Sequence, residues 1–199
     1  GQSGLLPYAI PAAGLGQAWP SGAFEQACNR LASLPGAADF ACSLAAALAD
    51  WPAERVDDLA REMTCSNELR KEVVWLIEAL PRATQPEALS LADVKRLMAS
   101  GYFENLKRLL LADLSARHES LEPWQVLRER SAAIPREKVQ PAPLVDGEDL
   151  KSLGVTPGPI YKKVLDAVYT AQLNEQLADR AEALGLLRRE LAEAGYPAA

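Results

Sequence analysis

The sequence predicts an all-α protein, a multi-helix body of about ten helices with a helical hairpin near the C-terminus. Alanine and leucine are abundant and β-branched residues are sparse, which favours helix over strand. Apolar residues recur at helical spacing, and Gly and Pro divide these patterns into segments of helix length. With 199 residues, 49% apolar and 24% charged, the chain has the composition of a globular protein and can bury a core.

Residues 1–20 are rich in Gly and Pro and are expected to form an irregular lead-in, followed by a helical body at 21–134. The stretch 37–50 is almost wholly apolar, which indicates a buried central helix. Helices are expected at about 21–34, 37–50, 53–63, 66–80, 90–100, 102–118 and 122–133.

Capping and turn residues set several of these limits. Ser66 or Asn67 is expected to open a helix, and Pro81 to follow its end. Ser90 with Asp93 three residues later resembles a capping box for the next helix. Near the C-terminus, Asp179 with Glu182 is a similar pair.

The segment "PREKVQPAP" at 135–143 has three prolines and no periodicity, so it is the best candidate for a linker. It separates the body from a helical tail at 144–199. Within the tail, helices are expected at about 146–153, 159–175 and 180–194.

The first two tail helices meet in the turn "LGVTPGP". Gly154 suits a left-handed residue after the first helix, and Thr156 could cap the second, with Pro157 or Pro159 in its first turn. Gly158 would let another backbone approach this helix N-terminus, an anion-friendly position. Residues expected to pack the two helices together are Leu150, Leu153, Val155, Ile160, Val164 and Leu165.

The net charge of −6 counts against a strong stand-alone nucleic-acid binder, because contact with phosphates needs clustered Lys and Arg. Five dibasic pairs nevertheless fall on expected helices, where they could be solvated faces or parts of a basic track. These pairs are Arg70-Lys71, Lys95-Arg96, Lys107-Arg108, Lys162-Lys163 and Arg188-Arg189.

No catalytic residue or metal ligand is expected in this chain. The one histidine, His118, lies at a helix end, and no nucleophile, zinc or phosphate-loop motif occurs. Three widely spaced cysteines suit a reducing compartment. With no signal peptide and no apolar run of membrane-spanning length, the sequence predicts a cytoplasmic protein that does not bind a membrane.

The segment from "LVDGEDLKSLGVTPGPIYKK" to "EALGLLRREL" resembles the C-terminal helical region of bacterial tRNA nucleotidyltransferases and poly(A) polymerases, the class II CCA-adding family. "SNELRKEVVWLIEAL" and "LSLADVKRLM" are more weakly similar to upstream family segments. The matching tail residues are Gly147, Asp149, Leu150, Leu153, Gly154, Pro157, Gly158, Pro159, Leu165, Gln172, Leu173, Glu182, Ala183 and Leu184.

The resemblance implies a tRNA-holding body and tail, without the head domain that transfers nucleotides with magnesium. This chain alone would then be catalytically inactive, with no cofactor of its own and with tRNA or another RNA as partner. Where relatives carry a His-Asp phosphohydrolase-like (HD-like) module, Ala49 and Asp50 appear in place of the His-Asp pair, which implies a degenerate module without its metal site. The alternative is a helical scaffold that binds protein. The RNA-binding candidates are Lys151, Gly158, Lys162, Lys163, Arg96, Lys107 and Arg108.

Overall fold

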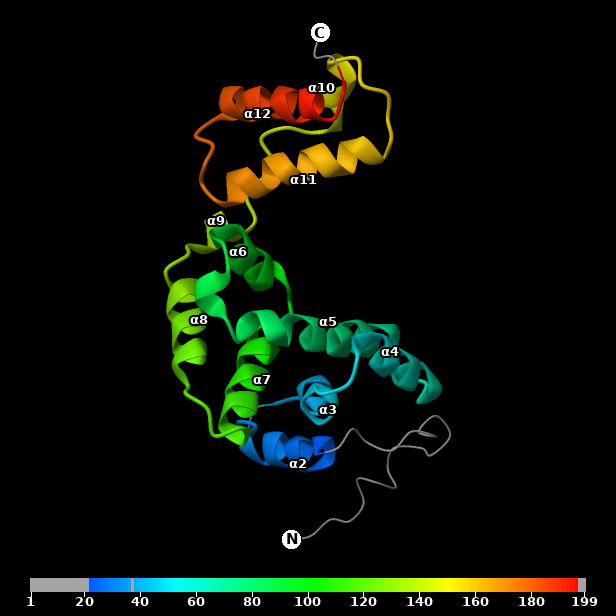
Figure 1. Cartoon of the computed structure of the whole chain (residues 1–199), viewed down its shortest axis with the longest axis vertical. Coiled ribbons are helices and arrows are strands. Elements are labelled where there is room, and N and C mark those ends of the chain that lie inside the picture. Colours follow the sequence, from blue (N-terminus) through cyan, green and yellow to red (C-terminus); the bar gives the residue numbers. More distant parts are fainter. Residues whose placement is uncertain (1–21, 37, 197–199) are drawn as a thin grey trace. The chain divides into compact units, whose positions relative to one another are not determined.

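The computed structural model describes residues 22–36 and 38–196, and these residues form eleven α-helices, one short 3-10 helix and no strand (Figure 1). The prediction of an all-α fold is therefore confirmed. The lead-in expected at 1–20 lies outside the described residues. Within the part of the chain that the structure describes, no helix is both long enough and apolar enough to cross a membrane.

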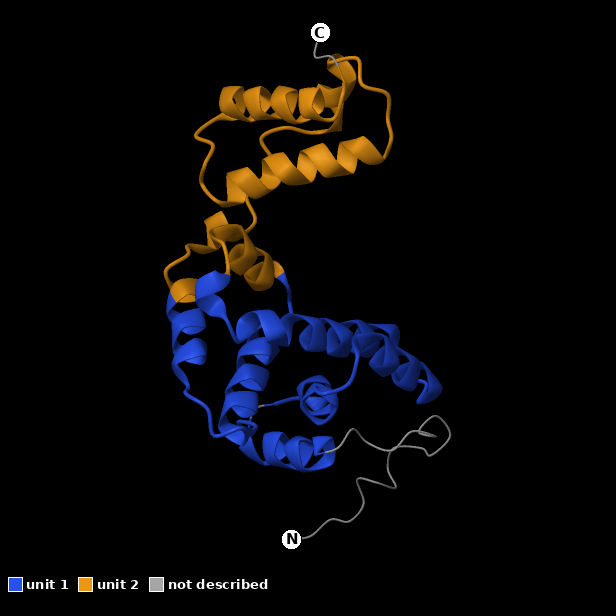
Figure 2. Ribbon diagram, viewed as in Figure 1, with its two compact units in different colours: residues 1–88, 100–129 blue, residues 89–99, 130–199 orange. Residues whose placement is uncertain are grey.

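The chain divides into two compact units (Figure 2): unit 1 is residues 1–88 and 100–129, and unit 2 is residues 89–99 and 130–199. The helices of unit 1 are α2 (Ala23–Ser33), α3 (Phe40–Leu48), α4 (Ala53–Glu62), α5 (Asn67–Ala83), α7 (Phe103–Ala116) and most of α8 (Glu122–Ala132). Those of unit 2 are α6 (Leu91–Ala99), α9 (Arg136–Val139), α10 (Gly147–Ser152), α11 (Pro159–Leu173) and α12 (Arg180–Glu193). The 3-10 helix is Pro86–Ala88.

In unit 1, helix α3 packs against α2, α5 and α7, and α4 packs on α5. Most side chains of α3 are buried, as its apolar sequence predicts. The side chain of Asp39 caps this helix by accepting a hydrogen bond from the backbone N–H of Cys42 at 2.9 Å. In the helix expected at 102–118, helical spacing places Phe103, Leu106, Leu110 and Leu114 on one side, and α7 buries all four.

Helix α5 begins as predicted and ends later than predicted. The hydroxyl of Ser66 caps it by accepting a hydrogen bond from the backbone N–H of Leu69. Pro81 was expected to follow the helix but lies inside it, and the helix continues to Ala83. A proline lacks one N–H donor for the helix, and the buried Leu80 and Ala83 keep the last turn packed on the core despite this loss.

Unit 2 has its own hydrophobic core, in which α11 packs against α10, α12 and α6. The packing predicted for the α10–α11 hairpin is confirmed: three of the six apolar residues are buried in this core and the other three pack against it. The buried residues of this core are Val145, Leu150, Val155, Val164, Val168, Ala183, Leu187 and Leu191.

The turn between α10 and α11 matches part of the predicted geometry. Gly154 has a left-handed φ of 74° just after α10, and Pro159 starts α11. The residue at the N-cap of α11 is Gly158, with no side-chain cap, so Thr156 does not cap this helix. A Cβ atom at Gly158 would lie 3.9 Å from the carbonyl oxygen of Thr156, an ordinary contact, so no described backbone approaches closely here.

The expected linker at 135–143 lies within unit 2 and contains α9. Helix α6, from the expected body, belongs to the same unit because its side chains bond to the end of α11. The buried Lys95 donates to the carbonyl oxygen of Leu173 at 2.8 Å, and the side chain of Asn174 accepts from the backbone N–H of Ala92. These contacts join residues about eighty positions apart, which helical spacing does not predict.

Candidate nucleic-acid interface

A shallow groove of about 260 Å³ in unit 1 is lined by residues of α7, α8 and the turn after α2. Helix α7 supplies one wall because its apolar stripe is buried in the core and its opposite face is left for the groove. On this face Lys107, Arg108 and Leu111 lie three, four and seven residues after Glu104, so the four share one side of the helix.

Helix α8 supplies the other wall. Its buried residue Leu127 anchors it, and Trp124 and Arg128, one turn apart, line the groove. The guanidinium carbon of Arg128 lies 4.7 Å from the centroid of the Trp124 ring, so the cation stacks on one face of the indole. Pro35, from the turn after α2, completes the lining.

The lining residues include three cations and one carboxylate, so the groove is electropositive although the chain is acidic overall. Lys107 forms an ion pair with Glu104 at 2.8 Å and lies 5.1 Å from the centroid of the Phe103 ring. Arg108 donates to the side-chain oxygen of Asn105 at 2.8 Å. These contacts hold both cations in place at the groove and leave further donors on each for an anion.

Acidic residues behind the groove are already engaged with other partners. The amide of Asn105 donates to the carboxylates of Asp39 and Glu72 at 2.8 and 2.7 Å. The pKa of Asp39 is lowered chiefly by the hydrogen bond from the backbone N–H of Cys42, against the opposing effect of burial, and the Asn105 amide and the charge of Arg108 lower it further.

The structure brings together two of the seven predicted site residues, Lys107 and Arg108. In unit 2, Arg96 bonds to Asp166 and to the hydroxyl of Thr170, and Lys151 bonds to Glu148. The exposed side chains of Lys162 and Lys163 on α11 make no ion pair or hydrogen bond with other described residues. Gly158, at the N-terminus of the same helix, is exposed.

The groove residues Arg128 and Trp124 were not among the predicted candidates. The sequence "EPWQVLRERS" does contain a signal for them, because an aromatic residue followed four positions later by an arginine places both on one face of a helix. That α8 would turn this face toward Lys107 and Arg108 depends on tertiary packing, which the spacing alone does not give.

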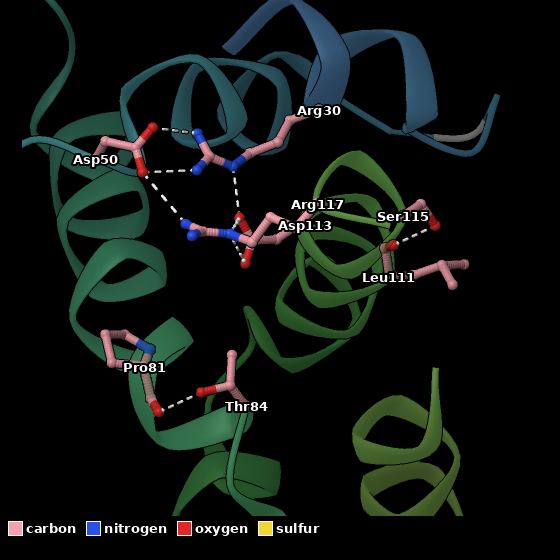
Figure 3. Close-up of polar contacts among 8 residues, drawn as sticks. All are labelled: Arg30, Asp50, Pro81, Thr84, Leu111, Asp113, Ser115 and Arg117. Atoms are coloured by element: carbon pink, nitrogen blue, oxygen red, sulfur yellow. Dashed lines mark hydrogen bonds and ion pairs between the residues drawn. The ribbon is translucent and has the colours of Figure 1, made fainter. Parts of the chain in front are cut away.

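A second polar cluster in unit 1 surrounds the fully buried Arg30 of α2 (Figure 3). Its guanidinium donates to both carboxylate oxygens of Asp50, at 2.6 and 2.7 Å, and to Asp113 of α7 at 2.5 Å. Arg117 bonds to the same two carboxylates, at 3.0 Å to Asp113 and 3.3 Å to Asp50. Two arginines thus balance two aspartates, and the cluster links α2, α7 and the turn after α3.

Burial alone would lower the pKa of Arg30, but the hydrogen bonds with Asp50 and Asp113 outweigh it and raise the pKa above its ordinary value. Asp50 is held by the guanidinium groups of Arg30 and Arg117. With Ala49, it occupies the place where relatives in the resembled family carry a His-Asp pair. Among the described residues, no group of three or more His, Cys, Asp and Glu side chains is arranged to hold a metal ion.

His118 follows the end of α7 in a left-handed conformation with φ of 55° and is exposed. Its backbone N–H donates to the carbonyl oxygen of Ser115, so its position is that of a residue ending a helix.

No family model, no curated protein and no solved structure matches this chain. The fold and the groove themselves define the class: an all-α protein of two compact units, one of which has an electropositive groove with an aromatic wall.

Proposed function

We propose that this chain is an RNA-binding helical region, of the kind that holds tRNA in the tRNA nucleotidyltransferase and poly(A) polymerase family. The proposal combines the resemblance of the tail segment with one structural observation, the groove that gathers Lys107, Arg108 and Arg128 beside Trp124. In this proposal the chain binds RNA in the cytoplasm. Nucleotidyl transfer and its magnesium belong to a head domain that the resemblance implies.

The groove supports RNA as the ligand because its groups match the groups of a nucleic-acid strand. Lys and Arg side chains contact phosphate oxygens, and arginine does so with two parallel donors. Aromatic rings and guanidinium planes stack on bases. A groove that holds a cation–aromatic pair next to two further cations offers both kinds of contact within one small area.

The exposed lysines of α11 support a second contact with the phosphate backbone. Lys162 and Lys163 lie in the first turns of a fifteen-residue helix, near its electropositive N-terminus. Each unit is proposed to contact RNA by its own residues.

Fluorescence anisotropy with a labelled tRNA at low salt tests the proposal. The double variant K107E/R108E should bind at least about tenfold more weakly than the unchanged chain, because two phosphate contacts become repulsive. The matched control is R61E/K71E, which makes the same charge change on exposed residues of unit 1 that pair with helical neighbours. Equal losses in both variants, or no binding by the unchanged chain, would refute a specific RNA interface at the groove and favour the protein-binding scaffold.

A further inference from the structure

The groove contains an aromatic surface that contact with phosphates alone does not require. Trp124 is half-buried and lines the groove, and the guanidinium of Arg128 stacks on its ring at 4.7 Å. A guanidinium over an indole places a planar cation beside an aromatic ring, and both groups attract the face of a nucleobase.

Only an unpaired base can use such a surface. Inside a double helix both faces of each base are already stacked on neighbouring bases, and proteins that bind double-stranded RNA contact mainly phosphates and 2′-hydroxyls. A base that has left the stack can insert its face against an aromatic ring. An aromatic ring such as that of Trp124 would therefore favour single-stranded over double-stranded RNA, whereas phosphate contacts from Lys107 and Arg108 would not.

The dimensions of the groove also suit part of a strand. Its volume of about 260 Å³ is smaller than the roughly 300–1,000 Å³ of pockets that enclose a whole small-molecule ligand. Its wall carries the apolar side chains of Leu111 and Pro35 beside the cations. A single base with its neighbouring phosphate matches this combination of apolar and charged surface.

We infer that the groove binds an unpaired RNA base, stacked against the Trp124–Arg128 pair, with Lys107 and Arg108 on the adjoining phosphate. This inference rests on the proposed RNA-binding function and specifies its ligand as a single-stranded segment. In a folded RNA the segment would be a loop, a bulge or an unpaired end.

The test compares one RNA sequence as a single-stranded twelve-nucleotide oligomer and as its duplex, with three variants of the chain. W124L removes the aromatic ring and keeps an apolar side chain, W124F keeps a smaller ring, and K107E/R108E removes the phosphate contacts. Circular dichroism of each variant checks that it remains folded. The W124L variant should bind the single strand about 5- to 100-fold more weakly and the duplex equally well, with W124F between W124L and the unchanged chain.

The outcomes separate the inference from the proposed function. If W124L weakens both RNAs equally, or neither, while K107E/R108E weakens both, stacking on Trp124 is refuted and RNA binding at the groove stands. If K107E/R108E changes neither affinity, the groove is not the RNA site, and both proposals fail. If W124L does not fold, the W124F variant decides, because it removes the indole at this position. The inference is refuted if W124F and the unchanged chain have the same affinity for both RNAs and show the same quenching of tryptophan fluorescence when the single strand is added.

Discussion

Arg30 illustrates how a single buried charge organises unit 1. A guanidinium with no exposure to solvent is costly to bury unless its charge is balanced and its donors are satisfied. Asp50 and Asp113 meet both conditions with three hydrogen bonds, and Arg117 balances the remaining negative charge. The cluster therefore holds three segments of the chain in one relative position.

Replacing Arg30 by alanine should strongly destabilise the protein. R30A would leave two largely buried carboxylates facing each other with only Arg117 as partner, so we expect the free energy of unfolding to fall by about 3–5 kcal/mol. The control R61A removes an arginine that also pairs with an aspartate but is 60% exposed, and it should cost less than about 1 kcal/mol. Urea denaturation measures both; similar losses would contradict the assigned role of burial. If R30A does not fold, R30K, which keeps the charge without the forked geometry, should still lose more stability than R61A.

Cys42 should react with alkylating reagents only at high pH. Burial, followed by the nearby charge of Asp39, raises the pKa of its thiol to about 11, and the thiol donates to the carbonyl oxygen of Asn105. Because only the thiolate reacts and Cys42 is fully buried, Cys42 in the folded chain should be alkylated much more slowly at pH 8 than the other two cysteines, and faster as the pH rises. Mass spectrometry after iodoacetamide treatment checks this, with the partly exposed Cys28 and Cys65 as internal references. Alkylation of Cys42 at pH 8 as fast as that of Cys28 would contradict it.

At the residue scale, the sequence predicts local hydrogen bonds well and distant ones poorly. A spacing of three residues predicts the mutual hydrogen bonds of Ser90 and Asp93. The same spacing predicts that the side chain of Asp179 caps α12 by accepting from the backbone N–H of Glu182. The bond from Arg30 to Asp113 spans 83 positions, and no periodicity connects the two residues. The same limit explains why Trp124 and Arg128 were missed beside Lys107 and Arg108.

Among the elements, the turn between α10 and α11 has two glycines with different roles. Gly154 needs its positive φ of 74° to end α10, whereas Gly158 is fully extended, with φ of −178°, a conformation open to any residue. The turn therefore depends on one glycine for its geometry. The backbone conformation at Gly158 does not require glycine.

Alanine substitutions distinguish the two glycines. G154A should destabilise the protein by about 1–2 kcal/mol, because a Cβ atom is disfavoured at positive φ even where it contacts nothing within 4 Å. G158A should change stability by less than about 0.5 kcal/mol, because its Cβ atom meets only an ordinary contact at 3.9 Å. Thermal unfolding followed by circular dichroism measures both. If G158A is as damaging as G154A, the described hairpin geometry is wrong.

The existence and type of the elements could be predicted from the sequence, because helix periodicity and capping act over a few residues. The stripe of α7 and the packing of the α10–α11 hairpin are both confirmed. The predicted end of α5 was wrong because the last turn of the helix tolerates Pro81 and remains packed on the core. The association of α6 with α11 depends on Lys95 and Asn174, which meet partners far along the chain.

At the scale of the whole molecule, charge is distributed unevenly. The chain has a net charge of −6, yet the groove of unit 1 has three cations and one carboxylate among its lining residues. Many acidic side chains elsewhere form ion pairs within helices or cap helix ends, as Asp57 pairs with Arg61 and Asp146 caps α10. An overall negative charge is therefore compatible with a local site for phosphates, and binding should depend steeply on salt.

The proposed contact of Lys107 and Arg108 with RNA phosphates can be tested by the salt dependence of RNA affinity. The slope of log affinity against log salt concentration reports how many phosphates a protein neutralises, at about 0.7 per contact for a single strand. Measured with the single-stranded oligomer, K107E/R108E should reduce this slope by about 1.4, and R61E/K71E should leave it unchanged. An equal slope for the unchanged chain and K107E/R108E would contradict the claim.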